Sequence, residues 1–492
     1  MTQEEINILM QPTQQKFIKL EVYDINNNKL NTIEGNLLGG TLSIDSTVAI
    51  RRSLSGLNFV VTDKKFIPGY NSYFWINTKI RIAVGIKSIF TGKIIWFHMG
   101  WFLIDKPDIK RSQTTYEVTI TGSDKMMLLN GGRGGYLSDA VRTEIAIGTP
   151  ISQAIRDVLT DFGETNYLVD DILDTDGVVL TVPTTIDKDN TSNAYELINT
   201  LGTLYDGWQI YYSAGTSTEQ PVFVYQAIKD MSDSVISWDF SENNTIIDID
   251  NQPNFDGVAN SVSVYGSSNT QYSPSGLALS ATSGNLVAGS YAYCVTAMNS
   301  NGQSTPCLEV GITLSSTGGV ILAWSEVTDA ESTFTVSYCI YGRKSGEELL
   351  LGTTTSVTFT DNGSAVGTTE MPTGQAYAKV ENNTATSPFS IANAKRVINY
   401  SETESTFTTN EACLARAEKV LWQKSYLAEG VTISSSPLYG IDVNQIIKLD
   451  RKDLNLTGKF LITKLSFDLT LTGIMTLTCS RLYKYESDAT SY

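Results

Sequence analysis

Alternation of apolar and polar residues, the pattern of a half-buried β-strand, runs through the first quarter of the chain from Lys16 onward. The asparagine run Asn26–Asn28 marks an early turn. The aromatic, glycine-interrupted run Ile94–Ile104 predicts paired strands and not a helix. Residues 1–135 are therefore predicted to form a tube-like β-barrel that ends in the glycine-rich linker Gly131–Gly135. Its other expected strands are Gly40–Ile50, Gly56–Thr62, Ile80–Val84 and Tyr116–Thr121.

Helical spacing replaces the alternation in the next part, and residues 136–256 are predicted to form an α+β domain. Pro150 suits the first position of one helix. A second helix is expected over residues 193–205, where Asn193 and Glu196 have the spacing of a capping box. The apolar face of the first helix consists of Ile151, Ala154, Ile155, Val158, Leu159 and Phe162.

The rest of the chain predicts three further parts. Residues 257–272 are expected to form a strand that returns to the barrel core. Residues 273–374 are rich in Ser, Thr and Gly and predict an inserted β-sandwich. Residues 375–492 predict a second tube-like β-barrel with one helix from Asn410 to about Glu429. The predicted fold class is thus mainly β with α+β parts: two tube-like β-barrel domains, an acidic α+β domain and an inserted β-sandwich.

The charge of the chain is concentrated in one block. The 492 residues have a formal net charge of −17. Residues 150–256 have 19 acidic residues against Arg156, Lys188 and Lys229, which gives this block a net charge of −16. Because phosphate contacts require cations, the block is a poor candidate for holding nucleic acid. It suits a surface that repels DNA, a surface that contacts a basic partner, or a solvated face without a specific partner.

Candidate catalytic chemistry is sparse. His98 is the single histidine, which excludes multi-histidine metal sites and catalytic schemes that need a second histidine, and its aromatic neighbours favour a structural role. Asp105, Asp108 and Asp124 lie in or beside β segments, and no local arrangement pairs them. No CxxC motif is present, and free thiols in a reducing compartment are favoured over a disulfide for the five cysteines, Cys294, Cys307, Cys339, Cys413 and Cys479.

Two sequence patterns suggest ligand binding, but a purely structural role is the better interpretation of each. Asp170–Gly177 resembles a calcium loop, but the required spacing puts Ile172 and Pro183 at ligand positions, so this segment and the similar Asp187–Asn190 and Asp248–Asn251 are predicted to be turns. We predict no catalytic residue, no cofactor site, no metal ligand and no enzyme activity. Aromatic residues of the first region can stack on sugars, but a core or subunit contact is favoured for Tyr70, Tyr73, Phe74, Trp75, Trp96, Phe97, Trp101 and Phe102.

The order of these elements resembles that of the baseplate hub (tail-associated) proteins of phages and phage-like tails. The insertion resembles a fibronectin-type or immunoglobulin-like module, marked by Tyr291–Ala297, Leu322–Trp324, Tyr338–Tyr341 and Phe359–Gly363, which the simplest hub proteins lack. The hub resemblance is carried by Gly100–Pro107 and Tyr116–Asp124 for the first barrel, by Pro150–Phe162, Ala194–Leu204 and Gly207–Ile210 for the middle region, and by Asp442–Leu449, Gly458–Ile462 and Gly473–Leu477 for the last barrel.

The resemblance implies a homotrimeric ring that joins the tail tube to the tip. Its partners would be tail tube and distal tail proteins, a spike or tip protein and the tape-measure protein, with DNA only in transit, past an acidic lining, and with no membrane span. Met1–Gln15 shows no secretory signal, so we expect synthesis in the host cytoplasm and residence in the virion tail tip. Two alternatives stay open: a glycan-binding or adhesive multi-domain surface protein, and a tail-associated cell-wall hydrolase that uses carboxylates.

Overall fold

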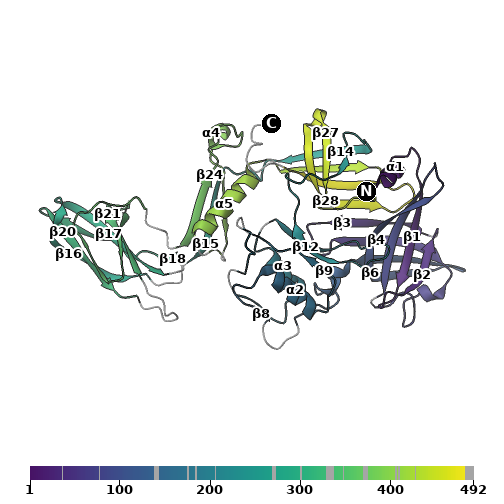
Figure 1. The fold of residues 1–492 in the computed structure, drawn as a ribbon, viewed down its shortest axis with the longest axis horizontal. Coiled ribbons are helices and arrows are strands. Elements are labelled where there is room, and N and C mark those ends of the chain that lie inside the picture. Colours follow the sequence, from purple (N-terminus) through teal and green to yellow (C-terminus); the bar gives the residue numbers. More distant parts are fainter. Residues whose placement is uncertain are drawn as a thin grey trace. The chain divides into compact units, whose positions relative to one another are not determined.

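The computed structural model describes residues 1–482 except 36, 77, 138–142, 174–176, 183–184, 206, 269–272, 300–301, 328–336, 347, 370–374, 405–406, 408–409 and 427. Strands make up 48% and helices 12% of it, which confirms the predicted mainly β class. The chain folds into two compact units. Unit 1 comprises Met1–Asn254 and the described residues from Ala428 onward, and unit 2 comprises the described residues between them (Figure 1).

The N-terminal half of the large sheet in unit 1 follows helix α1 (Gln3–Leu9), whose capping box joins Thr2 and Glu5. The strands lie in the order β3-β4-β7-β6-β5-β1-β2, and all neighbours are antiparallel. Side chains alternate between buried and less buried along β4, as the sequence predicts for a strand with one core face. The bounds are β1 (Gln15–Tyr23), β2 (Lys29–Glu34), β3 (Leu37–Asp45), β4 (Arg52–Val61), β5 (Lys79–Lys87), β6 (Ile94–Arg111) and β7 (Tyr116–Ser123), with the 3-10 turn η1 (Lys64–Phe66).

A second set of strands in the same sheet comes from both sides of unit 2 in the sequence. It has the order β14-β26-β29-β28-β27-β13. Neighbours are antiparallel except for β13 and β27, which are parallel. The bounds are β13 (Ile236–Asp239), β14 (Ile246–Asn254), β26 (Ala428–Ser435), β27 (Ile446–Arg451), β28 (Leu456–Asp468) and β29 (Met475–Arg481), with the 3-10 turn η3 (Lys452–Leu454).

The two sets repeat one topology. Taken in sequence order, β1, β3, β4, β5, β6 and β7 correspond to β13, β14, β26, β27, β28 and β29, and the two sets then have the same order in the sheet. Both β6 and β28 are long strands whose first part pairs with the preceding strand and whose last part pairs with the following one. The short β3–β4 turn corresponds to the β14–β26 connection, which contains all of unit 2. The repeats differ in two places: β2 has no counterpart, and β13 runs opposite to its equivalent.

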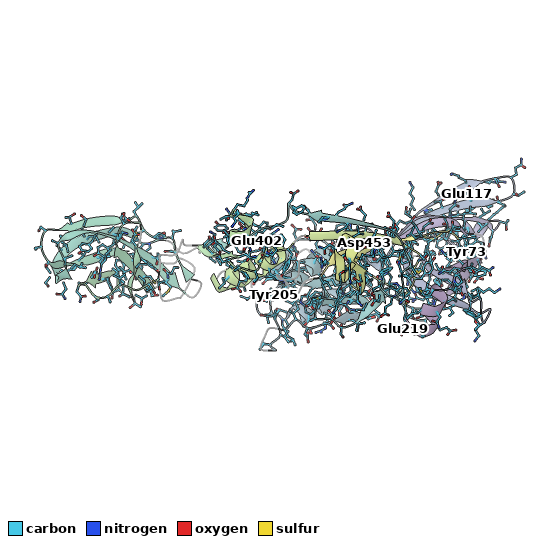
Figure 2. All side chains as sticks on the ribbon, turned by 90° about the horizontal axis from the view of Figure 1, so that it is seen from above. Tyr73, Glu117, Tyr205, Glu219, Glu402 and Asp453 are labelled. Carbon is cyan, nitrogen blue, oxygen red and sulfur yellow. The ribbon has the colours of Figure 1, made fainter. Side chains whose placement is uncertain are left out.

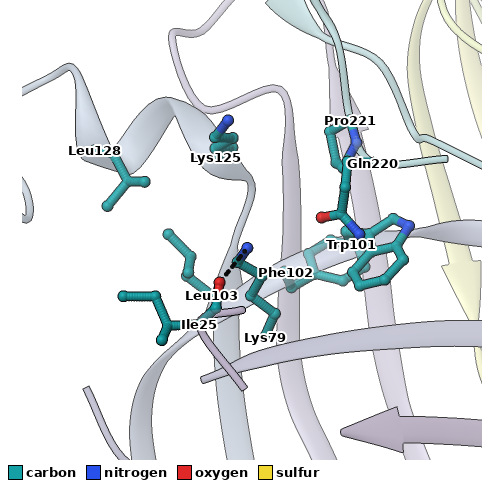
Figure 3. A pocket seen from close by; sticks show the side chains of 9 residues that line it. All are labelled: Ile25, Lys79, Trp101, Phe102, Leu103, Lys125, Leu128, Gln220 and Pro221. Carbon is teal, nitrogen blue, oxygen red and sulfur yellow. Dashed lines mark hydrogen bonds between the residues drawn. The ribbon is translucent and has the colours of Figure 1, made fainter. Parts of the chain in front are cut away.

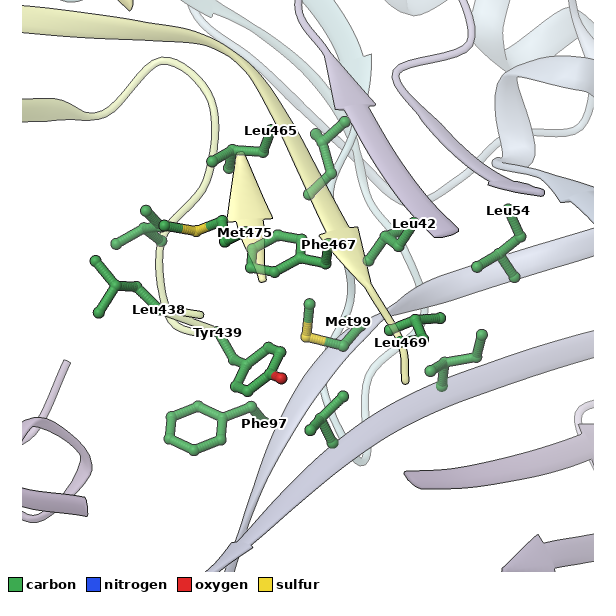
Figure 4. Close-up of a cluster of buried hydrophobic side chains, with 14 of the residues drawn as sticks. Leu42, Leu54, Phe97, Met99, Leu438, Tyr439, Leu465, Phe467, Leu469 and Met475 are labelled. Atoms are coloured by element: carbon green, nitrogen blue, oxygen red, sulfur yellow. The ribbon is translucent and has the colours of Figure 1, made fainter. Parts of the chain in front are cut away.

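The repeats meet where β28 pairs with β3, with Phe467 opposite Leu42 and Leu465 opposite Ile44. Figure 1 shows the yellow C-terminal strands beside the purple N-terminal ones. Beneath the pairing, the rings of Phe97, Tyr439 and Phe467 form a row, with centroids 5.9 Å and then 5.6 Å apart (Figure 4). These three side chains are buried in one core shared by both repeats, so neither repeat has a core of its own.

The α+β part lies between the repeats in sequence, and its core is separate. Both predicted helices are confirmed: α2 (Ile151–Asp161), which follows Pro150, and α3 (Ala194–Gly202), whose capping box joins Asn193 and Glu196. Their apolar faces bury Ile155 and Leu197 completely. The remaining elements are η2 (Lys125–Leu128), β8 (Thr143–Ile145) paired with β10 (Ile186–Lys188), and the sheet β11-β12-β9, formed by β9 (Tyr167–Val169), β11 (Trp208–Tyr212) and β12 (Phe223–Ala227).

Unit 2 contains a three-stranded sheet with a helix packed on it. Strand β15 (Ser261–Ser268) lies between β24 (Gln375–Glu381) and β25 (Asn399–Thr403). Helix α5 (Asn410–Lys424) packs on this sheet through Ala417 and Val420, and α4 (Ile391–Ala394) precedes β25. An ion pair joins Arg416 of α5 to Glu402 of β25, and Figure 2 labels that glutamate.

The segment between β15 and β24 is a two-layer β-sandwich. One sheet has the order β16-β20-β23, and the other has β18-β17-β21-β22 with β19 also paired to β17. Tyr293, Val295 and Trp324 belong to the core between the sheets. The strands are β16 (Ser275–Leu286), β17 (Gly289–Asn299), β18 (Gly302–Gln303), β19 (Val310–Leu314), β20 (Gly318–Ser325), β21 (Ser337–Arg343), β22 (Leu349–Thr354) and β23 (Thr358–Asp361).

The structure departs from the sequence prediction in how the strands are grouped. The sheets of the described residues are not closed barrels, because β2 pairs with β1 alone and β14 with β26 alone in the described part of the chain. The segment predicted as one barrel over 375–492 contributes to both units. The strand predicted within 257–272 pairs with β24 and β25 and not with unit 1. Alternation determines which face of a strand is buried but does not determine its neighbours.

Truncation of the aromatic row should destabilise unit 1. We expect Phe467→Ala to lower the free energy of unfolding by about 3–5 kcal/mol, because the change removes a fully buried ring and leaves a cavity between the repeats. Phe90→Ala is the control, because the Phe90 ring is 84% exposed. Urea denaturation followed by circular dichroism measures both variants. Equal stability of the two would contradict a shared core.

In the sandwich, the carboxylate of Asp361 accepts two hydrogen bonds of 2.7 Å from the guanidinium of Arg343. It accepts a third, of 2.9 Å, from the Tyr293 hydroxyl. Burial by itself would raise the pKa of Asp361, but these hydrogen bonds and that from the Gly363 N–H lower it below its ordinary value. The carboxylate therefore adds stability above the pKa of the unfolded chain, and this stability is lost as the pH falls through the lower folded-state pKa.

We expect Asp361→Asn to destabilise the sandwich by about 2 kcal/mol at neutral pH, because the half-buried side chain of Arg343 loses its charged partner. The variant should also lose less stability than the wild type below about pH 4. Hydrogen exchange of peptides that cover β17 and β21, measured against pH, reports this difference. Parallel pH profiles for both proteins would show that the carboxylate does not act in this way.

Candidate functional site

Four charged side chains and one glutamine from distant parts of unit 1 converge beside the start of β4. This arginine cluster consists of Arg51, Arg52, Asp124, Gln209 and Asp442. Arg52 is the first residue of β4, Asp124 caps η2 through the Met126 N–H, and Gln209 lies on β11. Asp442 precedes β27. The cluster thus joins the first repeat, the α+β part and the second repeat.

Arg52 is the centre of the arginine cluster and is 1% exposed. Its guanidinium donates to the Tyr212 carbonyl at 2.9 Å and forms an ion pair with Asp442. The Arg52 backbone N–H donates to the carboxylate of Asp124 at 2.8 Å. Burial raises the pKa of Asp124 to about 6, and the N–H donors of Arg52 and Met126 act in the opposite direction. A carbonyl and a carboxylate oxygen thus stabilise the terminal nitrogens of this buried guanidinium, and its Nε has no hydrogen-bond partner among the described residues.

Arg51 continues the arginine cluster toward the α+β part. Its guanidinium lies 3.6 Å from the ring centroid of Tyr211 and donates to the Gln209 side-chain oxygen. Burial lowers the pKa of Arg51 to about 10, although the charge of Asp442 favours the protonated form. Within the α+β part, the carboxylate of Glu164 accepts from Lys125 at 2.5 Å and from the Tyr212 hydroxyl at 2.6 Å. These contacts hold the α+β part against the sheet.

A second ion group forms on β1 and β5. Arg81 pairs with Glu21, which also accepts from the Tyr23 hydroxyl at 3.0 Å. Burial by itself would raise the pKa of Glu21, but the charge of Arg81 and these hydrogen bonds lower it. Burial also raises the pKa of Tyr23 to about 12. Because Arg81 donates to the carbonyl of Ser217 as well, it fixes the loop between β11 and β12 against the sheet.

A pocket of about 190 Å³ opens between the first repeat and the α+β part (Figure 3). Lys79 is one of its two half-buried lysines, and burial lowers the pKa of Lys79. The ammonium donates to Asn27 at 2.7 Å and to the Ile25 carbonyl at 3.5 Å. The lining offers apolar surface and positive charge, and its described residues include no nucleophile next to a base. It consists of Ile25, Lys79, Trp101, Phe102, Leu103, Lys125, Leu128, Gln220 and Pro221.

The acidic and histidine residues singled out from the sequence do not come together. Asp105 accepts from Ser123 at 2.5 Å, Asp108 is exposed on β6, and Asp124 belongs to the arginine cluster. His98 on β6 has a buried Nδ1 without a hydrogen-bond partner among the described residues, and burial lowers its pKa. Within the described ranges, no group of three or more His, Cys, Asp or Glu side chains is placed to hold a metal ion. The five cysteines are free and buried.

The turn predicted over Asp248–Asn251 is wrong, because this segment lies within strand β14 and pairs with β26. Asp187–Asn190 begins in strand β10 and turns only after Lys188. Other acidic side chains of the segments compared with calcium loops are engaged locally where they are described. Asp171 accepts from Ser152 and pairs with Arg156. Asp189 accepts from the N–H of Thr191 at 3.0 Å, as in a turn. Residues 174–176 lie outside the described part of the chain.

The aromatic run divides between core and surface. Phe74, Phe97 and Phe102 are buried in the core that both repeats share, whereas Tyr70 is 81% exposed and packs edge-on against Trp75. The run is therefore not one sugar-binding platform. Among the described residues, no helix is both long and apolar enough to cross a lipid bilayer.

Sequence reasoning missed the arginine cluster. Arg51 and Arg52 follow an ordinary turn, and Asp442 lies 390 positions after its partner Arg52. Neither spacing nor composition indicates that residues so far apart in the sequence form an ion pair. Arg52 and Asp442 come together because β3 pairs with β28. The one sequence signal available was the presence of two adjacent arginines at the start of an alternating strand.

Comparisons with known proteins give similarity to tail proteins at low sequence identity. A family model described as a domain of unknown function (DUF5048) matches residues 386–485, and no curated protein matches the chain. The 43 kDa tail protein of prophage MuSo2 from Shewanella oneidensis is similar over 95% of this chain and 98% of its own, with 10% identity and a TM-score of 0.49.

Two further tail proteins have similar structures. The tail protein from Neisseria meningitidis MC58 is similar over 94% of this chain and 96% of its own, with 10% identity and a TM-score of 0.47. The prophage tail protein gp18 from Listeria monocytogenes EGD-e is similar over 95% of both chains, with 10% identity and a TM-score of 0.42.

Removal of the carboxylate from the arginine cluster should destabilise unit 1. We expect Asp442→Ala to lower the free energy of unfolding by about 2 kcal/mol, because the buried guanidinium of Arg52 loses its charged acceptor. Asp453→Ala is the matched control, because Asp453 (Figure 2) pairs with Arg451 at the surface and its loss should leave the denaturation midpoint unchanged. A midpoint shift of the same size in both variants would contradict this role.

Proposed function

We propose that this chain is a structural baseplate hub protein of a phage or phage-like tail, one subunit of a homotrimeric ring that joins the tail tube to the tip. The observation that carries the proposal is the repeated strand order of β1–β7 and β13–β29 within one sheet. Three copies of a subunit with two similar halves together present six similar elements. Such a ring suits contact with a sixfold tube on one side and a threefold tip on the other. The element order of the sequence, which resembles that of hub proteins, supports the same assignment.

The chemistry of unit 1 also favours a structural role over an enzymatic one. Among its buried charged groups, Arg52 pairs with Asp442 and donates to a backbone carbonyl, and Glu21 pairs with Arg81. Such contacts stabilise the junctions between segments. A tail-associated hydrolase would need a carboxylate pair across a cleft, and the described carboxylates singled out from the sequence are dispersed.

Contacts between copies would use the two open ends of the sheet, β2 and β14. Strand β14 is poorly suited to pairing with a strand of another copy. Its Pro253 has no backbone N–H to donate, and it carries the charged side chains of Asp248 and Asp250. We therefore assign the contact to side chains such as Ile247, which is 62% exposed. The ring would admit the tape-measure protein and later DNA, and the acidic block of residues 150–256 would repel phosphate if it lines the channel. The sandwich, which we assign to the fibronectin type, would contact neighbouring tail proteins.

Solution mass tests the proposal. We expect sedimentation of the purified full chain to give a trimer, and cryo-electron microscopy to give threefold rings. Ile247→Asp should shift the chain toward the monomer, because a carboxylate would be buried at the contact. Leu308→Asp is the matched control, since Leu308 is 89% exposed in unit 2 and its change should leave the trimer intact. A wild-type chain that stays monomeric up to its solubility limit would contradict the trimer.

A further inference from the structure

A second cavity in unit 1, of about 340 Å³, differs in chemistry from the pocket of Figure 3. It lies where the turn after β3, helix α3, strand β11 and the middle of β28 meet. Its lining combines Trp208 and Tyr195 with neutral polar side chains such as Ser46, Thr47 and Asn199. No lysine, arginine, aspartate or glutamate belongs to this lining among the described residues.

The aromatic side chains of the cavity are held in place. The Trp208 ring packs against Tyr225, with centroids 4.9 Å apart, so the indole has a fixed orientation. The Tyr195 hydroxyl donates to the Asn199 side-chain oxygen at 3.4 Å. The Asn199 amide nitrogen makes no hydrogen bond to the described residues and remains a donor at the cavity. A fixed aromatic ring beside polar donors is the arrangement that binds an amphipathic ligand.

Gln209 joins the cavity to the arginine cluster. The residue lines the cavity and is 8% exposed. Its side-chain oxygen accepts from Arg51, which orients the amide. The amide nitrogen is buried and has no hydrogen-bond partner among the described residues. Arg51 therefore fixes the wall of the cavity at Gln209, and the amide donor that the cavity offers to a ligand is that of Asn199.

We propose that this cavity binds a neutral saccharide. A sugar ring presents C–H groups on one face, which pack against an aromatic ring, and hydroxyls around its edge, which accept from amide nitrogens and donate to threonine and serine oxygens. The absence of charged groups from the described lining disfavours phosphates and acidic sugars, since a buried anion requires a cation or several donors. The pocket of Figure 3, with its two lysines and apolar walls, has the opposite character. The proposal does not depend on trimer formation or on a place in a tail.

Saturation-transfer NMR of the purified full chain tests the proposal with glucose, galactose, N-acetylglucosamine and rhamnose as probes. We expect at least one of these neutral sugars to receive saturation from the protein. Glucuronate, which has the glucose ring with a carboxylate, should bind at least tenfold more weakly than the neutral sugar that binds best. The absence of transfer to all four neutral sugars, or equal binding of glucuronate, would overturn the proposal.

Matched variants place the binding in the cavity. Asn199→Leu keeps the side-chain volume but removes the amide, and we expect about tenfold weaker binding. Asn7→Leu, on the exposed face of α1, should leave binding unchanged. Trp208→Ala should abolish transfer, whereas Trp75→Ala, which removes a surface indole elsewhere, should not. Circular dichroism confirms that each variant is folded. Undiminished binding by folded Asn199→Leu and Trp208→Ala variants would place the sugar elsewhere and overturn the assignment.

Discussion

The pairing of β3 with β28 is the contact on which the rest of unit 1 depends. It joins residues 41–45 to residues 464–468 in one antiparallel register. The shared core and the Arg52–Asp442 ion pair both require it, because each has one member before unit 2 and one after it in the sequence. A register shift of one residue would turn Phe467 and Leu465 away from this core. The hydrophobic pattern of β28 therefore specifies where the two repeats meet.

This arrangement also explains how the chain accommodates a large insertion. Unit 2 leaves β14 at Asn254 and returns to β26 at Ala428, and these two residues are paired neighbours in the sheet. An inserted segment whose ends are adjacent adds little strain to its host, and loop closure costs grow slowly with length. The equivalent connection in the first repeat, between β3 and β4, is a short turn. One topology thus tolerates both a turn and a folded unit at the same point.

Much of the local structure could be predicted from the sequence, because local structure depends on near neighbours. The helix over Ile151–Asp161 followed from apolar spacing, and α3 followed from the Asn193–Glu196 capping box. The grouping of strands could not be predicted in this way, since the strand predicted within 257–272 joins α5 and β24 and not a barrel. Of the arginine cluster, sequence reasoning identified Asp124 alone and gave it no partner. Ion pairs across hundreds of residues leave no periodic signal.

The differences between the repeats matter as much as their likeness. Strand β1 runs antiparallel to β5, but its counterpart β13 runs parallel to β27. The first repeat carries the additional strand β2 at its free edge, whereas the second ends in the acidic strand β14. Two halves that differ at their edges cannot replace one another at a contact, because the side chains and backbone groups presented there are different. In the proposed ring of three chains, two kinds of junction would therefore alternate, one within each chain and one between chains. Because the two kinds differ, such a ring would have threefold and not sixfold symmetry, even though its strand order would repeat six times.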